Sequence, residues 1–158
     1  MKIFLTGGSG FIGKKFIKEC LNSGHIIYAL SRKKKQNNKN LIWLKGDLDN
    51  EDWFVYLKKT NILVHMAAAG VNNHASMREA ISENVIKPYK LLINALNSKC
   101  YKWLLIGSSS EYCKQAKVKK LLSTKTKEFP ETNYEKTKLL FTRLSFSLSK
   151  NLKRNVEL

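Results

Sequence analysis

The chain has 158 residues, of which 43% are apolar, and this supports one globular domain but not two large ones. Lys and Arg outnumber Asp and Glu by 29 to 12, which gives a formal net charge of +17. Such an excess favours an anionic partner, but the Lys residues are spread along the whole chain and only four of the cations are Arg. A solvated surface that reflects composition is therefore favoured over a nucleic-acid site.

Cysteine usage and apolar runs indicate the compartment. Cys20, Cys100 and Cys113 are odd in number and form no CxxC pair, which favours a reducing environment. The longest mostly apolar run, residues 62–71, is too short for a membrane span, and the N-terminus lacks the apolar region of a signal peptide. We therefore expect a cytoplasmic protein without a membrane partner. No His, Cys or Asp cluster has metal-ligand spacing, so no metal is expected.

Short apolar strands alternate with longer amphipathic stretches. In chain order the pattern predicts strands at Lys2–Thr6, His25–Leu30, Leu41–Leu44, Ile62–Met66 and Trp103–Ile106. The predicted helices are Phe11–Ser23, Asp49–Lys59, Ser76–Ser98 and Tyr134–Asn151. Pro88 is expected to kink the third of these helices. A long polar connection, residues 114–133, precedes the last helix. This alternation predicts an α/β fold with a doubly wound parallel sheet of about five strands.

A glycine-rich turn joins the first strand to the first helix. Residues 6–13 read TGGSGFIG and satisfy GxGxxG through Gly8, Gly10 and Gly13, and GxxGxxG through Gly7, Gly10 and Gly13. Glycine permits a tight turn and lets a pyrophosphate approach the backbone, while the free N–H groups that open the helix attract its charge. Because the turn lies between a strand and an amphipathic helix, a Rossmann-type dinucleotide site is favoured over a merely structural turn.

The end of the second strand bears on which dinucleotide is bound. NAD sites usually place an Asp or Glu about 20 residues after the glycines, where it binds the ribose 2′-hydroxyl. This chain has Ser31 and Arg32 there, followed by three Lys residues. Cations suit a 2′-phosphate, so NADP is favoured, with NAD as the alternative cofactor. The basic run can also be read as part of the general Lys excess.

Two polar motifs carry candidate catalytic groups. Tyr134 and Lys138 are four residues apart on the predicted last helix and therefore share one face. An ammonium beside a phenol stabilises the phenolate, so the pair can exchange a proton with a substrate hydroxyl while hydride moves to or from a nicotinamide. Residues 107–112, GSSSEY, follow the fifth strand, where open α/β sheets place their ligands. Either motif alone would be read as a surface pair or a polar loop.

Together these motifs resemble the extended short-chain dehydrogenase/reductase family, in particular its NAD(P)-dependent sugar-nucleotide epimerases, dehydratases and reductases. Further matching segments are Gly46-Asp47-Leu48, Ile62–Ala68, Asn84-Val85 and Leu91-Leu92. The resemblance implies catalysis by Tyr134, Lys138 and Ser108, with Ser109 as the next candidate hydroxyl, and support of the catalytic helix by Asn84. It implies a nucleotide-sugar substrate and leaves a homodimer open. The residues expected to bind the cofactor are Gly7, Gly10, Phe11, Ile12, Gly13, Ser31, Arg32, Asp47, Leu48, Ala67, Ala68, Ala69 and Lys138.

The chain also departs from the family pattern. Cys113 replaces a Gly, YEKTK replaces YGxSK and Lys87-Pro88 replaces a Gly-Thr pair, which leaves the subfamily open without removing a proton-transfer group. Family members continue with further strands and a smaller domain that grips the sugar nucleotide. We therefore expect residues 1–158 to be one incomplete NAD(P)-binding domain whose C-terminal substrate domain is absent and whose fifth strand is an unprotected edge. A fragment is favoured over a truncated pseudoenzyme or a protein completed by a partner chain.

Two other functions compete with an enzyme. A non-catalytic NADP-binding module fits the short length, and a nucleic-acid binder on a Rossmann scaffold is suggested by charge alone. The combination of Ser108, Tyr134 and Lys138 favours the enzyme over both.

Overall fold

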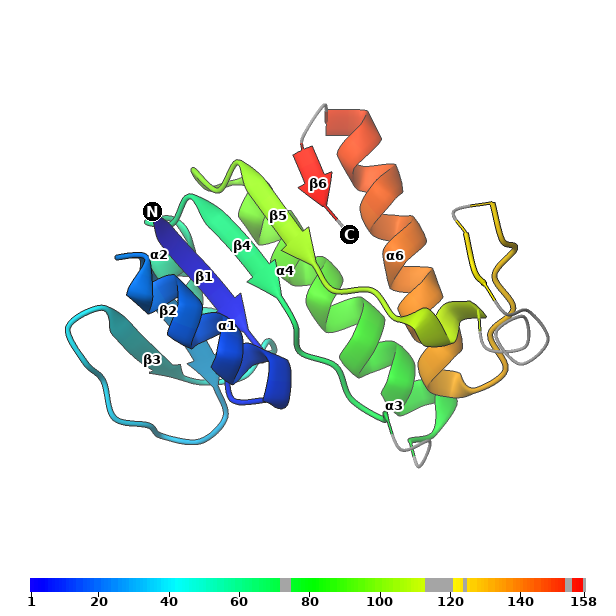
Figure 1. Ribbon diagram of the computed structural model, residues 1–158, viewed down its shortest axis with the longest axis horizontal. Coiled ribbons are helices and arrows are strands. Elements are labelled where there is room, and N and C mark those ends of the chain that lie inside the picture. The colour runs from blue at the N-terminus through cyan, green and yellow to red at the C-terminus, as the bar shows by residue number, and fades with distance from the viewer. Residues whose placement is uncertain (72–74, 113–120, 124, 153–154, 158) are drawn as a thin grey trace.

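Figure 1 shows the computed structural model, which describes residues 1–71, 75–112, 121–123, 125–152 and 155–157. Its core is a parallel sheet of six strands: β1 (Lys2–Thr6), β2 (Ile26–Ser31), β3 (Leu41–Lys45), β4 (Ile62–His65), β5 (Lys102–Leu105) and β6 (Asn155–Glu157). The helices are α1 (Phe11–Asn22), α2 (Phe54–Leu57), α3 (Met77–Ile81), α4 (Lys87–Leu96) and α6 (Asn133–Leu152). Three short turns complete the elements, η1 (Glu51–Trp53), η2 (Ser82–Ile86) and η3 (Ser109–Tyr112).

The strand order β3-β2-β1-β4-β5-β6 confirms the predicted doubly wound sheet. The chain builds outward from β1 to β3 and then crosses back to place β4 on the other side of β1. Successive strands are therefore added to one side of β1 up to β3 and to its other side from β4 onward. In open α/β sheets, ligands bind at the carboxyl ends of the strands at such a reversal.

The sixth strand corrects the expectation that β5 is an unprotected edge. Asn155–Glu157 forms β6, which pairs in parallel with β5 and places Val156 opposite Trp103. Strands therefore flank β5 on both sides. The sequence pattern predicted about five strands and did not count β6, because three residues with a single apolar member carry no periodic pattern.

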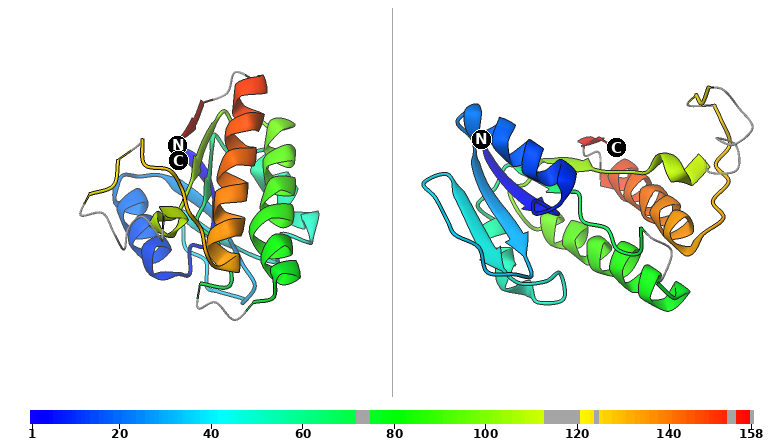
Figure 2. Two further views of the ribbon diagram at one scale, coloured as in Figure 1. Left: turned by 90° about the vertical axis from the view of Figure 1, so that its right-hand side faces the viewer. Right: turned by 60° about the horizontal axis from the view of Figure 1, so that its bottom comes forward.

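The two faces of the sheet bury different side chains. α1 covers one face, and α4 and α6 lie side by side on the other (Figure 2). Successive residues of β1 separate accordingly, because side chains alternate along a strand: Leu5 shares a core with Ile17 of α1, whereas Phe4 shares a core with Leu91 of α4. Helices on both faces explain why the strands are apolar throughout.

The helical stretch predicted over Ser76–Ser98 has three parts. Ser76 begins it with a capping box, in which its hydroxyl accepts from the Glu79 N–H and the Glu79 carboxylate accepts from the Ser76 N–H. The π-helical turn η2 then separates α3 from α4. Pro88, which has no N–H to donate, stands in the first turn of α4, so the irregularity expected at Pro88 is a π turn just before it.

The connection from η3 to α6 overlaps the long polar segment predicted at residues 114–133. Its described residues contain no helix or strand, and Cys113 lies outside the described residues. In the described ranges, no helix combines the length and the apolarity needed to cross a membrane.

Candidate functional site

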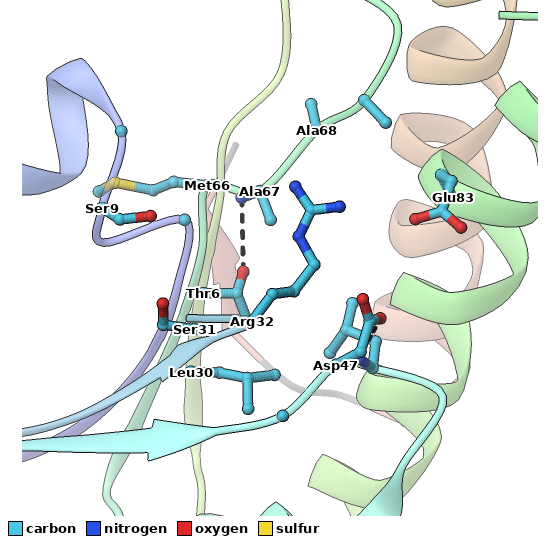
Figure 3. Close-up of a pocket in the computed structure, with 15 residues that line it drawn as sticks. Thr6, Ser9, Leu30, Ser31, Arg32, Asp47, Met66, Ala67, Ala68 and Glu83 are labelled. Carbon is cyan, nitrogen blue, oxygen red and sulfur yellow. Dashed lines mark hydrogen bonds between the residues drawn. The ribbon is translucent and has the colours of Figure 1, made fainter. Parts of the chain in front are cut away.

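A cavity of about 280 Å³ opens at the carboxyl ends of the central strands (Figure 3). Its walls come from the ends of β1 to β4, the segments that follow them, and η2. It therefore lies at the point where the sheet reverses its strand order. The lining residues are Thr6, Gly7, Ser9, Gly10, Leu30, Ser31, Arg32, Gly46, Asp47, Leu48, Met66, Ala67, Ala68, Ala69 and Glu83.

Two glycines of the turn are required by close backbone approach. Gly7 has φ +77°, and a Cβ there would lie 2.6 Å from the Ala67 backbone nitrogen. A Cβ on Gly13 would lie 2.3 Å from the Gly7 carbonyl oxygen. A Cβ on Gly10 would meet only the Gly7 carbonyl oxygen, at 3.3 Å, so this position has more room. Gly10 is the N-cap residue of α1 and offers no side-chain hydrogen bond. The first N–H groups of α1 thus have no side-chain cap from Gly10 and can receive an anion.

Most of the residues predicted to bind the cofactor line this cavity, namely Gly7, Gly10, Ser31, Arg32, Asp47, Leu48, Ala67, Ala68 and Ala69. Phe11 and Ile12 lie at the start of α1, where they are 94% and 60% exposed. Gly13 packs behind the turn, and Lys138 lies in α6, where its Nζ contacts the Ile106 carbonyl just after β5 and does not line the cavity. Glu83 also lines the cavity and was not predicted from the sequence, where only its position next to Asn84 could have indicated it.

Thr6 ties β1 to β4 below the cavity. Its hydroxyl accepts a hydrogen bond from the Ala67 N–H at 3.4 Å and lies 2.7 Å from Nδ1 of His65. The His65 ring is buried edge-on against Phe141. Burial, together with the positive charge of Lys138, lowers the pKa of His65 to about 3. His65 is therefore a neutral structural residue of the strand end.

The candidate catalytic residues come from the loop after β5 and the first turns of α6. Lys138 is only 5% exposed, and its Nζ donates a 2.6 Å hydrogen bond to the carbonyl oxygen of Ile106. Ser108 follows two residues later, half-buried, and its Oγ accepts from the Ser110 N–H at 3.2 Å. Tyr134 is also half-buried, one helical turn before Lys138. Burial lowers the pKa of Lys138, while the charge of Glu111 opposes that shift.

Glu111 is a buried carboxylate that sequence reasoning did not single out. Its Oε1 accepts from the Ser108 N–H at 3.0 Å and from the Thr142 hydroxyl at 3.3 Å. Burial raises its pKa, against the opposing effect of these hydrogen bonds and of Lys138. These contacts hold the Ser108 backbone against α6. In the sequence, the feature that could have indicated this role is that Glu111 is the one acidic residue of the hydroxyl-rich segment 107–112.

Asn84 connects the cavity to the helix that carries Tyr134 and Lys138. Its Oδ1 accepts from the Ala69 N–H at 2.8 Å, and its Nδ2 donates to the Ala69 carbonyl at 3.0 Å and to the Thr137 hydroxyl at 3.2 Å. Thr137 directly precedes Lys138 in α6. The contact that the family resemblance implied, between Asn84 and this helix, is therefore present. The π turn places Asn84 in this buried position.

Charged side chains border the cavity where β3 ends. Nζ of Lys87 lies 2.6 Å from Oδ2 of Asp49 and 3.9 Å from Oδ1 of Asp47, and it also donates to Oε1 of Glu83. Its hydrogen bonds to Asp49 and Glu83 raise the pKa of Lys87 above the ordinary value. Among the described side chains, no carboxylate lies within 4.0 Å of the Arg32 guanidinium. Figure 3 shows Arg32 reaching from the end of β2 into the cavity.

Metal ligation is not indicated at this site. Within the part of the chain that the structure describes, no three His, Cys, Asp or Glu side chains gather closely enough to hold a metal ion.

The sequence matches the NAD dependent epimerase/dehydratase family over residues 3–155. The sterol-4-alpha-carboxylate 3-dehydrogenase, decarboxylating, of Dictyostelium discoideum is 34% identical over 100 residues, which cover 60% of this chain and 30% of that protein. The UDP-glucose 4-epimerase of Klebsiella pneumoniae is 30% identical over 105 residues, which cover 60% of this chain and 71% of that protein.

A solved structure shows the same fold. The UDP-glucuronic acid 4-epimerase from Bacillus cereus, in complex with UDP-glucuronic acid and NAD, superposes with a TM-score of 0.86 at 23% sequence identity. The match covers 99% of this chain and 55% of that chain. The chain therefore spans about half the length of that structure and 30% of the Dictyostelium relative.

Proposed function

The chain belongs to the NAD-dependent epimerase/dehydratase family, and from this premise we propose that it forms the cofactor-binding and acid–base part of an NAD(P)-dependent nucleotide-sugar oxidoreductase, epimerase or dehydratase. The observation that carries the proposal is a spatial one. The glycine-turn cavity and the loop that contacts Lys138 lie at the carboxyl ends of neighbouring strands, β4 and β5. One extended ligand can therefore meet both.

The cavity fits a dinucleotide by several features. Gly7 and Gly13 bring strand, turn and helix so close that side chains are excluded, and the uncapped start of α1 offers N–H groups to a pyrophosphate. We assign the adenosine end to Ser31, Arg32, Asp47 and Leu48, and the path toward the nicotinamide to Ala67–Ala69. When bound, the dinucleotide supplies or accepts the hydride. Phe11 and Ile12 contribute through their backbone N–H groups at the helix start.

Proton transfer is assigned to Tyr134, with Lys138 and Ser108 as its partners. Tyr134 exchanges a proton with a substrate hydroxyl, and Lys138, four residues later on the same face of α6, is its cationic partner. The Ser108 hydroxyl hydrogen-bonds the reacting oxygen, and Glu111 holds the Ser108 backbone in place.

NADP is the cofactor we assign to the site. Arg32 lines the cavity at the end of β2 without a carboxylate partner among the described side chains, which supports binding of a 2′-phosphate. The solved Bacillus epimerase is in complex with NAD, so NAD is the alternative that must be measured beside it. The two cofactors differ only in the phosphate that Arg32 would bind.

A nucleotide sugar is the substrate we assign, because UDP-sugar epimerases occur among both the sequence relatives and the solved structures. The Dictyostelium relative is named for a sterol carboxylate instead. An assay of the complete protein with UDP-sugars and with a sterol substrate separates these two classes. Turnover of the sterol alone would overturn the substrate assignment and leave the cofactor site intact.

Calorimetric titration with NADPH and NADH, followed by turnover assays, tests the whole proposal. We expect both dinucleotides to bind, NADPH more tightly, and the complete protein to turn over a nucleotide sugar. Dinucleotide binding without any turnover would support a non-catalytic NADP-binding module instead. Salt-dependent binding to nucleic acid that survives saturation with NADPH would support a nucleic-acid binder.

A further inference from the structure

Lys87 joins two walls of the cavity that come from different elements. Asp47 and Asp49 belong to the loop after β3, whereas Glu83 belongs to η2. Lys87 contacts all three carboxylates, yet it does not itself line the cavity. We infer that Lys87 is a positioning residue that holds this loop against η2 and so builds the adenosine end of the cofactor site. The inference rests on the proposed function, because it takes the cavity as a dinucleotide site.

The contacts of the loop show why Lys87 matters for its position. Gly46 and the residues after it form no helix or strand up to η1. On one side, the Trp53 indole donates a 3.0 Å hydrogen bond to the Asp47 carbonyl. On the other side, the ion pairs of Lys87 link the loop to η2 and α4, and the Lys87 side chain is only 13% exposed. The carboxylates of Asp47, Asp49 and Glu83 are 37%, 61% and 35% exposed, so each pair has one largely buried and one partly exposed partner. Water screens such a pair less than a fully exposed surface pair.

The charges of the cluster lead to a second consequence. Asp47 and Glu83 line the cavity in which a dinucleotide with its negatively charged phosphates would bind, and like charges repel. Lys87 offsets this negative potential from behind the wall. It also engages the carboxylates that would otherwise attract Arg32, so that the Arg32 guanidinium stays available for a ligand phosphate. Lys87 thus favours binding of the cofactor without touching it.

Binding of NADPH, NADH and ADP to variants of the chain tests this inference, because ADP keeps the adenosine and the two phosphates and lacks the nicotinamide riboside. We expect Lys87→Met to raise the Kd of all three probes by about tenfold. Lys87→Arg, which keeps the charge, should restore most of the affinity. Lys90→Met is the matched control, because Lys90 is an exposed lysine of the same helix and does not line the cavity. In the complete protein, Lys87→Met should raise the KM for the dinucleotide and leave kcat unchanged.

A second variant separates positioning from loss of folding. Asp49 is 61% exposed and does not line the cavity, so Asp49→Asn weakens the ion pair without burying or removing a wall residue. We expect Asp49→Asn to weaken ADP binding, and the double variant with Lys87→Met to bind ADP no more weakly than Lys87→Met alone.

Three results would count against the inference. Unchanged ADP affinity in a folded Lys87→Met variant, or losses that simply add in the double variant, would overturn it while the proposed function stands. A wild-type chain that binds none of the three probes would overturn the proposed function and this inference with it. Thermal unfolding of each variant, measured alongside, shows which variants are folded.

Discussion

The Lys138 ammonium donates a 2.6 Å hydrogen bond to the carbonyl oxygen of Ile106, and this bond joins the second turn of α6 to the residue that follows β5. The two residues are 32 positions apart in the chain. Their contact places the loop that carries Ser108 beside the helix that carries Tyr134. The groups assigned to proton transfer are therefore brought together by this contact and by the hydrogen bonds of Glu111 to the Ser108 N–H and the Thr142 hydroxyl.

The exchange of Tyr134 for Phe tests the proton-transfer assignment. In the complete protein we expect Tyr134→Phe to bind NADPH as the wild type does and to lose about 10²–10⁴-fold in kcat, because the phenol that moves the proton is gone. Tyr101→Phe is the matched control, since Tyr101 is an exposed residue next to β5. Steady-state kinetics and NADPH titration measure both quantities. Unchanged kcat in Tyr134→Phe would remove this mechanism.

The choice of cofactor depends on Arg32. We expect wild-type protein to bind NADPH more tightly than NADH, and Arg32→Ala to weaken NADPH binding while NADH binding changes little, because only NADPH carries the 2′-phosphate. Lys34→Ala, an exposed cation of the same basic run outside the cavity, should leave the preference unchanged. Fluorescence titration gives both dissociation constants. Equal affinities of the wild type for the two cofactors would refute the NADP assignment.

Gly13 and Gly10 should respond differently to the same substitution. A Cβ on Gly13 would sit 2.3 Å from a backbone oxygen, so Gly13→Ala must shift the turn, and we expect a stability loss of roughly 1–3 kcal/mol or failure to fold. Gly10→Ala meets that oxygen only at 3.3 Å, and we expect it to fold but to bind the dinucleotide more weakly. Chemical denaturation and NADPH titration distinguish the two effects. Equal stability losses in the two variants would contradict this division of roles.

His65 makes the stability of the chain depend on pH. Its pKa is lowered to about 3 in the folded state, chiefly by burial, so between pH 6.5 and pH 3 the unfolded chain binds a proton that the folded chain does not. The free energy of unfolding should therefore fall with acidification in this window, by up to about 1.4 kcal/mol per pH unit from His65. In His65→Gln this contribution disappears.

Urea denaturation of both proteins between pH 7 and pH 4 measures the difference. The wild-type free energy of unfolding should decline more steeply than that of His65→Gln, whatever their relative stability at pH 7. Other groups that titrate in this range, including Glu111 with its raised pKa, are present in both proteins and cancel in the comparison. Parallel curves would show that His65 does not stay neutral in the folded state.

Local sequence patterns predicted most of the fold. The apolar runs located β1 to β5, because both faces of these strands are buried and their composition records it. β6 was not among the about five strands predicted, since its place in the sheet comes from pairing with β5 and not from its own three residues. The π turn at η2 was also not foreseen, although Pro88 marked the irregularity beside it.

For the site, the sequence by itself determined the groups whose chemistry is local: the glycines of the turn, the cation at the end of β2, and the Tyr134–Lys138 spacing on one helix face. These depend on backbone geometry within a few residues. Tertiary structure alone decided which distant groups meet. It placed Glu111 against Ser108, Asn84 between Ala69 and Thr137, and Lys87 among three carboxylates. Such contacts arise from how the elements pack on the sheet, and no periodicity along the chain encodes them.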